Sequence, residues 1–187
     1  MCIEQRIQEI AQNQNTIFYF IEPGVSDYKN IMQLYSQRNN KDNDKLLRYL
    51  FYRFYNIQGL SREKRAMCFE YFLKNAGQSK KSFYDGICGI TERNELSLTT
   101  KLFHTANPKD EIIIDLHVRN FCGRTGEDLN LQLWSNIKKD FIQKGCNRLE
   151  KIFNDLFPDD KDIFPYKKID FMIWGWGKWK KLSEGNE

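Results

Sequence analysis

The 187-residue sequence contains few of the residues that mark several common protein classes. Four prolines and 11 glycines are too few for a loop-rich, collagen-like or low-complexity chain. No apolar stretch of about 18 residues is present, so the sequence predicts neither a transmembrane helix nor a membrane partner. The first ten residues include three charged side chains and no apolar signal core. We therefore expect an intracellular protein, in the cytoplasm or in the nucleoid or nucleus.

Cysteine and histidine are poorly placed for metal or disulfide chemistry. The five cysteines are scattered, odd in number and never spaced as C-x-x-C, so we expect reduced thiols and no structural zinc site. The two histidines, His104 and His117, have no neighbouring carboxylate cluster in the sequence, and we expect no metal ligands.

Several motifs of common enzymes are missing as well. The sequence contains no G-x-x-x-x-G-K, G-x-G-x-x-G, H-E-x-x-H or G-x-S-x-G. Their absence disfavours ATPases, dinucleotide enzymes, zincins and serine hydrolases of the usual kinds.

Aromatic residues and helical periodicity are what the sequence has in abundance. It contains 14 phenylalanines, nine tyrosines and four tryptophans, most of them at helical spacing, where they supply a core. We therefore predict an all-α protein, with residues 1–187 forming one compact helical domain. The net charge of +4 is compatible with a polyanionic partner but does not establish one.

Four segments do not read as helix. Thr16–Ile21, followed by Pro23 and Gly24, is predicted to be an extended segment or a buried turn. The other three are a polar loop at Gln37–Asp44, a turn-like stretch at Gly89–Glu95, and an isoleucine run at Ile112–Ile114 that is too short for a strand. The region from Leu129 to Phe157 reads as helical, with a possible interruption at Gly145.

The most informative stretch for function lies between Asn94 and Arg124. It reads as a helix, a break at Asn107-Pro108, the buried run Ile112–Ile114, and then Asp115 at the start of another helix. A carboxylate beside a dry apolar wall suits chemistry in which positive charge develops on a substrate.

The segment Ile112-Ile113-Ile114-Asp115-Leu116-His117-Val118-Arg119 resembles the segment that follows the hairpin in helix-hairpin-helix DNA glycosylases. In that superfamily the aspartate stabilises the oxocarbenium-like sugar of a flipped nucleotide, or helps to activate the attacking nucleophile. The resemblance therefore implies a catalytic role for Asp115, DNA as the partner and no cofactor.

The hairpin and the lysine of that superfamily are not matched here. Ile87-Cys88-Gly89-Ile90-Thr91 retains one glycine and lacks the proline and the second glycine of the hairpin. No lysine occupies the position of the superfamily's nucleophile, because Lys101 lies a turn or more further along the helix. The resemblance thus favours a monofunctional enzyme in which water attacks the sugar.

A closer resemblance is to small bacterial proteins related to this superfamily and covers about residues 80 to 180. Those proteins share a Ser-x-x-Thr-Lys-Leu-Leu-His motif before Asn-Pro and a terminal Asp-x-x-Leu-Trp-x-x-Gly-Lys motif. The corresponding residues here are Ser97–His104 and Ile169–Lys178. We expect a set of residues to contact nucleic acid and one tryptophan of the C-terminal aromatic segment to be a candidate for base stacking. The set is Lys101, Arg119, Arg124, Gly89, Ser97 and His117, and the tryptophan is Trp174.

Each of these residues also has a purely structural interpretation. Asp115 is equally suited to cap its helix, and this role is compatible with catalysis. Lys101, Arg119 and Arg124 can be solvated surface cations, His117 a structural histidine and Trp174 a core residue. Two hypotheses follow: a base-excision enzyme, or a non-catalytic helical module that binds nucleic acid or protein. The oligomeric state is not predicted.

Overall fold

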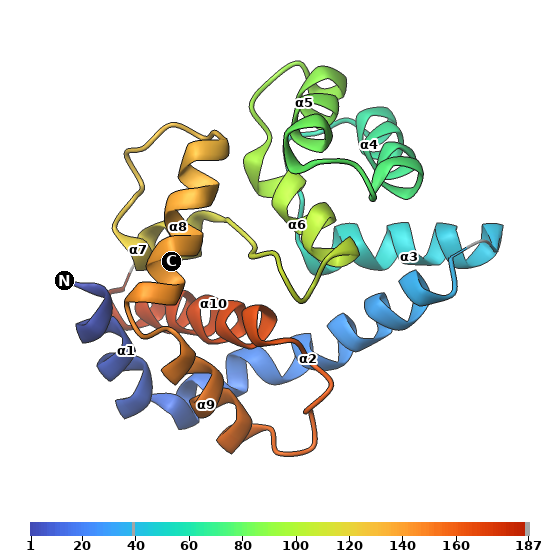
Figure 1. The fold of residues 1–187 in the computed structure, drawn as a ribbon. Coiled ribbons are helices and arrows are strands. Elements are labelled where there is room, and N and C mark those ends of the chain that lie inside the picture. The colour runs from blue at the N-terminus through green and yellow to red at the C-terminus, as the bar shows by residue number, and fades with distance from the viewer. Residues whose placement is uncertain (39, 186–187) are drawn as a thin grey trace.

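Ten helices form the regular structure of residues 1–38 and 40–185, the part of the chain that the computed structural model describes (Figure 1). No strand occurs in these residues, and the predicted all-α class is confirmed. The helices are α1 (Ile3–Gln12), α2 (Gln14–Ser36), α3 (Lys41–Phe54), α4 (Arg62–Asn75), α5 (Lys80–Thr91), α6 (Leu96–Ala106), α7 (Leu116–Cys122), α8 (Leu131–Gln143), α9 (Asn147–Leu156) and α10 (Pro165–Ser183).

Two groups of helices share α2 and α10 as a common base (Figure 1). Helices α3 to α6 form one group, and α1 and α7 to α9 form the other. Helix α10 packs along α2 and also contacts α7 and α9, while α2 packs against α3. An irregular segment, residues 107–115, leads from α6 in the first group to α7 in the second.

Helix α2 corrects the prediction for Thr16–Ile21, because it continues through Pro23 without a break. Its buried residues form a stripe at helical spacing, and the burial of this apolar stripe stabilises a continuous helix. Pro23 deprives the Tyr19 carbonyl of its donor, but the Tyr19 side chain is 73% exposed and water can replace the lost bond. The buried residues are Ile17, Ile21, Val25, Tyr28, Ile31 and Tyr35.

Helix α5 also extends into a segment that was predicted to be a turn. It runs through Gly89 to Thr91, and the chain turns at Glu92, which has a positive φ of 59°. The loop before α3 is also shorter than expected, since this helix begins at Lys41.

Capping side chains and glycines mark several helix ends, including the predicted interruption at Gly145. Ser61 accepts a hydrogen bond from the Lys64 amide at 3.1 Å at the start of α4. Gly123, with a φ of 70°, ends α7, and Gly145, with a φ of 74°, separates α8 from α9. These positions need the left-handed backbone that glycine adopts without strain.

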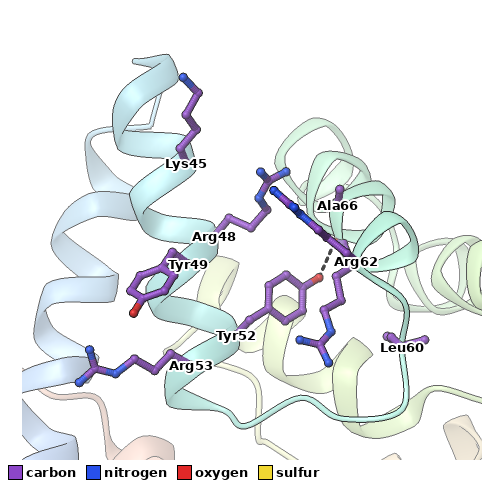
Figure 2. A pocket seen from close by; sticks show the side chains of 9 residues that line it. Lys45, Arg48, Tyr49, Tyr52, Arg53, Leu60, Arg62 and Ala66 are labelled. Atoms are coloured by element: carbon purple, nitrogen blue, oxygen red, sulfur yellow. Dashed lines mark hydrogen bonds between the residues drawn. The ribbon is translucent and has the colours of Figure 1, made fainter.

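Helices α3 and α4 face each other at the edge of the first group (Figure 2). The Tyr52 hydroxyl on α3 donates a hydrogen bond to the Arg65 carbonyl on α4 at 2.6 Å.

Among the described residues, no helix is both long enough and apolar enough to span a membrane.

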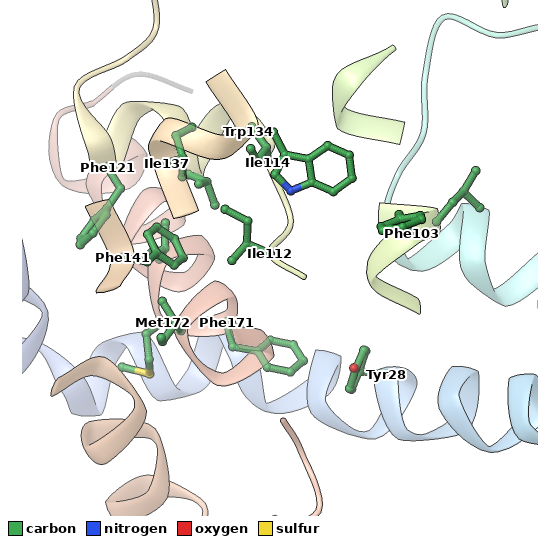
Figure 3. Packing of buried hydrophobic residues seen from close by; sticks show 14 of the residues in the cluster. Tyr28, Phe103, Ile112, Ile114, Phe121, Trp134, Ile137, Phe141, Phe171 and Met172 are labelled. Carbon is green, nitrogen blue, oxygen red and sulfur yellow. The ribbon is translucent and has the colours of Figure 1, made fainter. Parts of the chain in front are cut away.

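The isoleucine run lies in the core between α8 and α10. Ile112 and Ile114 are essentially fully buried, and Figure 3 shows them among Trp134 and Ile137 of α8 and Met172 of α10. This burial fixes the path of the segment that ends at Asp115.

Helix α10 packs tightly against α2 at Gly175. A Cβ atom at this position would lie 2.6 Å from the Ile21 Cγ2 and 2.8 Å from the Ile17 Cγ2. We predict that Gly175→Ala lowers the free energy of unfolding by about 1–3 kcal/mol, because a packed interface cannot accept an added methyl group. Gly89→Ala, where no atom lies within 4 Å of the new Cβ, should raise it by about 0.5–1 kcal/mol. Urea unfolding of both variants measures the difference, and equal effects would contradict this packing.

Candidate functional site

Asp115 begins α7 as its N-cap. Its Oδ1 accepts a hydrogen bond from the Val118 amide at 2.9 Å, which satisfies one of the free amides at the helix start. Within the described residues no donor bonds to Oδ2, and the side chain is half-buried. The predicted capping role is therefore present, and one carboxylate oxygen remains free to interact with something else.

Two side chains of α6 hold the backbone that leads to Asp115. The Thr100 hydroxyl accepts from the Ile114 amide at 3.0 Å and donates to the Ser97 carbonyl at 3.1 Å. One turn further along α6, the His104 Nδ1 donates to the Glu111 carbonyl at 2.6 Å. Side chains of a helix thus supply the hydrogen bonds that a neighbouring strand would supply in a sheet.

Four ionisable side chains meet beside the N-terminus of α7, and we call them the ionic cluster: Lys101, Asp115, Lys167 and Asp170. Lys101 is 8%, Lys167 2% and Asp170 6% exposed. The Lys167 Nζ lies 2.6 Å from the Asp170 Oδ2. Lys101 has no carboxylate within ion-pair distance in the described residues, although the charges of Asp115 and Asp170 both act on it.

Aromatic rings enclose the Lys167 ammonium. Its Nζ lies 4.4 to 5.1 Å from four ring centroids, a range in which ring faces attract a cation. These rings belong to Tyr28 of α2, to Phe54 and Tyr55 at the end of α3, and to Phe171 of α10. The Lys101 Nζ lies 5.6 Å from the Tyr55 ring as well, so this tyrosine contacts both ammonium groups.

Burial changes the protonation chemistry of the cluster. It lowers the pKa of Lys101, and the charges of Asp115 and Asp170 oppose this shift. It raises the pKa of Asp170, which the Lys167 ammonium opposes. It also raises the pKa of Tyr55 well above its ordinary value, and the nearby Thr105 hydroxyl opposes this rise. The Tyr55 hydroxyl nevertheless has no hydrogen-bond partner of good geometry among the described residues.

His104 lies next to the cluster and has a structural role. Because a carbonyl can only accept, the proton lies on Nδ1, and Nε2 accepts from the Tyr28 hydroxyl at 3.1 Å. Burial, helped by the nearby Lys167 charge, lowers the pKa of His104 to about 3. The imidazole is therefore neutral at physiological pH.

The predicted arginine contacts lie further along the chain, and one of them is already paired. The Arg124 Nε lies 2.7 Å from the Asp140 Oδ2, and its Nη1 lies 2.5 Å from the Glu127 Oε1. In residues 1–38 and 40–185, the side chain of Arg119 makes a single long hydrogen bond of 3.5 Å, to the Thr125 carbonyl. Arg119 is thus the less constrained of the two for a phosphate contact.

The remaining predicted residues are divided between the cluster region and other surfaces. Ser97 is half-buried near the start of α6, and Gly89 is exposed inside α5. The His117 ring packs onto Gly177 of α10. Trp174 is half-buried one turn beyond Asp170 on the same face of α10, with the Lys178 Nζ 5.2 Å from its ring.

Sequence reasoning identified Asp115 and Lys101 but assigned no role to Lys167 or Asp170. Asp170 opens the quoted C-terminal motif, and Lys167 precedes it by three residues, which is the spacing of a helical ion pair. That spacing was the available signal, but it does not distinguish a buried pair from a solvated one.

The cluster contains two amines and two carboxylates, a set poor in metal ligands. Among residues 1–38 and 40–185, no group of three or more histidine, cysteine, aspartate or glutamate side chains is placed to hold a metal ion. What the cluster can do chemically is stabilise or transfer charge in a site that is largely shielded from water.

No protein-family model, curated protein or solved structure matches this chain.

The hydrogen bond from Ile114 to Thr100 can be tested with adjacent threonines. We predict that Thr100→Val lowers the free energy of unfolding by about 1–3 kcal/mol, because the buried Ile114 amide loses its acceptor. Thr99→Val is the matched control, because the Thr99 hydroxyl is buried without a partner, and its removal should be neutral or stabilising. Chemical denaturation of both variants decides, and a harmless Thr100→Val would show that this bond does not hold the segment.

The neutral His104 predicts how stability depends on pH. Its pKa of about 3 in the folded protein is below the ordinary 6.5, so the unfolded chain binds the extra proton and stability falls as pH decreases from 6.5 toward 3. We expect wild type to lose up to about 1.4 kcal/mol per pH unit more than His104→Gln, which keeps an amide donor and an acceptor. Urea unfolding at a series of pH values measures the difference, and parallel curves would be the contrary result.

Proposed function

We propose that this protein binds DNA and hydrolyses the N-glycosidic bond of a damaged or modified base, with Asp115 as the catalytic residue. The carbon–nitrogen bond to the base would break, water would add to the sugar carbon, and the products would be the free base and an abasic sugar. This proposal joins the resemblance of the Asp115 segment to base-excision glycosylases with the arrangement of the ionic cluster.

The observation that carries the proposal is the placement of Asp115 beside buried charges with one oxygen unused. Burying ionisable groups is costly, and an ammonium such as Lys101 without a paired carboxylate is rarely kept for stability alone. Strongly perturbed ionisable groups gather where a protein performs chemistry. The Tyr55 hydroxyl, buried and without a hydrogen-bond partner among the described residues, adds a polar group available to a ligand.

Each member of the cluster has a place in this reaction. The Asp115 Oδ2 would face the positive charge that develops on the sugar and would orient the attacking water. Lys101 balances the carboxylates before that charge appears, and the Lys167–Asp170 ion pair keeps the wall of the site in place. Trp174, one turn beyond Asp170, would offer a face for stacking.

A second function, nucleic-acid binding without catalysis, is favoured by the region that corresponds to the hairpin. Gly89 lies inside a helix rather than in a turn of exposed amides, and Arg124 is already paired with two carboxylates. Asp115 also lines neither the groove between α3 and α4 nor the smaller cavity beside Tyr28. A module of this kind would bind DNA and release no base.

The two functions are separated by Asp115→Asn. Asparagine is as good an N-cap as aspartate, so the variant should fold normally and lose only the negative charge. We expect wild type to release a base from at least one duplex in a panel of damaged bases, detected by alkaline strand cleavage. Asp115→Asn should reduce the rate by roughly a hundredfold or more, the scale of losing one charge-stabilising group. Asp128→Asn, at an exposed carboxylate in the loop after α7, is the control and should keep full activity.

Three outcomes would contradict the proposal. Wild type would release no base from any duplex of the panel, or Asp115→Asn would retain the wild-type rate. Alternatively, borohydride would trap a covalent adduct through Lys101, which would replace water attack by amine attack.

A further inference from the structure

A groove between α3 and α4 is strongly basic. It has a volume of about 590 Å³, and five of its lining residues are cations: Lys45, Arg48 and Arg53 on α3, and Arg62 and Arg65 on α4. No carboxylate lines it. Figure 2 shows the Arg48 and Tyr52 side chains extending from α3 toward α4. These cations belong to two helices that are separate in the sequence, and the placement of α3 beside α4 brings them together.

The charges of the groove are not neutralised by the protein itself. Among the described residues, none of the four arginines forms an ion pair, and Lys45 has only an exposed contact of 3.5 Å with Asp42. The Arg65 Nε is buried without a hydrogen-bond partner, while its guanidinium lies 5.8 Å from the Tyr52 ring. Like charges that line one groove repel one another, so an anion bound there would lower the electrostatic energy of the fold.

Aromatic rings alternate with the cations. Tyr49 lies between Arg48 and Arg53 in the α3 sequence and is 61% exposed, an unusual state for a large ring in a protein that buries most of its aromatic residues. The Tyr52 ring lies between α3 and α4, and its hydroxyl donates a hydrogen bond to the Arg65 carbonyl (Figure 2). Exposed rings next to guanidinium groups are the combination by which proteins hold unpaired bases and their phosphates.

We infer that this groove binds a single-stranded segment of nucleic acid, with phosphates on the arginines and a base on Tyr49. From Lys45 to Arg53 the helix rises by about 12 Å, which is enough for several consecutive phosphates of one strand. A duplex would leave Tyr49 without a base to stack on, because its bases are already stacked on one another. The groove uses no residue of the ionic cluster, so this inference does not depend on Asp115 acting on a glycosidic bond.

Fluorescence anisotropy with a labelled 20-nucleotide single strand, at a series of KCl concentrations, tests this assignment. We expect Arg48→Gln/Arg62→Gln to weaken binding at 0.1 M salt by roughly tenfold or more. It should also reduce the slope of log affinity against log salt by about 0.7 for each phosphate that the variant no longer neutralises. Tyr49→Ala should weaken binding by roughly tenfold and leave the slope unchanged, because a stacking contact releases no counterion.

The matched control is Arg148→Gln/Lys151→Gln, which removes two exposed cations from α9, away from the groove, and should bind with the wild-type affinity and slope. Circular dichroism and thermal unfolding establish that each variant is folded. If Arg48→Gln/Arg62→Gln does not fold, the exposed pair Lys45→Gln/Arg53→Gln replaces it. Strand binding is read from anisotropy and base release from alkaline strand cleavage, so that failure of the groove and failure of base release remain distinguishable.

Four results would overturn the inference. They are no measurable binding of the strand, equal losses in the groove and control variants, tighter binding of the matching duplex than of the single strand, and binding of phosphatidylserine vesicles without binding of the oligonucleotide.

Discussion

The ion pair between Lys167 and Asp170 is the constraint around which the two groups of helices are arranged. Both side chains are almost fully buried, and such a pair is tolerated only where its surroundings replace the water that it has lost. The replacement comes from rings on three helices: Tyr28 of α2, Phe54 and Tyr55 from the end of α3, and Phe171 of α10. The position where α2, α3 and α10 meet is therefore set by electrostatics as much as by apolar packing. The same position brings Lys101 and Asp115 beside the pair.

The protein thus has two very different electrostatic regions. The ionic cluster contains equal numbers of ammonium and carboxylate groups and is shielded from water, so its charges act strongly over short distances. The groove between α3 and α4 contains only cations and is open to solvent, so its field extends outward and is sensitive to salt. The ionic cluster is suited to stabilising charge at a single reacting bond, and the groove is suited to attracting a charged polymer.

The sequence was informative where the determining contacts are local. The helix start at Asp115 and the interruption at Gly145 were predicted correctly, because each depends on contacts or backbone geometry within a few residues. The helix break predicted near Pro23 was wrong. The burial of Ile17 and Ile21 against α10 is a long-range stabilisation, and it outweighs one missing hydrogen bond.

The candidate site was predictable only in part, for the same reason. Asp115 stood out because an apolar run and a helix start lie on either side of it. Lys101 was predicted to be a nucleic-acid contact or a solvated cation, and Lys167 was assigned no role, since helical periodicity does not reveal that a charged side chain enters the core between helices. The groove depends on α3 facing α4, and the sequences of the two helices do not indicate that pairing.

The hydrogen bonds between α6 and the segment before Asp115 determine which parts of the ionic cluster would move together. Thr100 and His104 form hydrogen bonds to the backbone of residues 111–114 from the same helix that contains Lys101. Lys101 and Asp115 therefore belong to one rigid unit. Lys167 and Asp170 belong to another, because both lie on α10. If the molecule opened at this junction to admit a ligand, the ionic cluster would divide between the two units. Each unit would keep one ammonium and one carboxylate, so the separation would leave no net charge on either wall of the opened space.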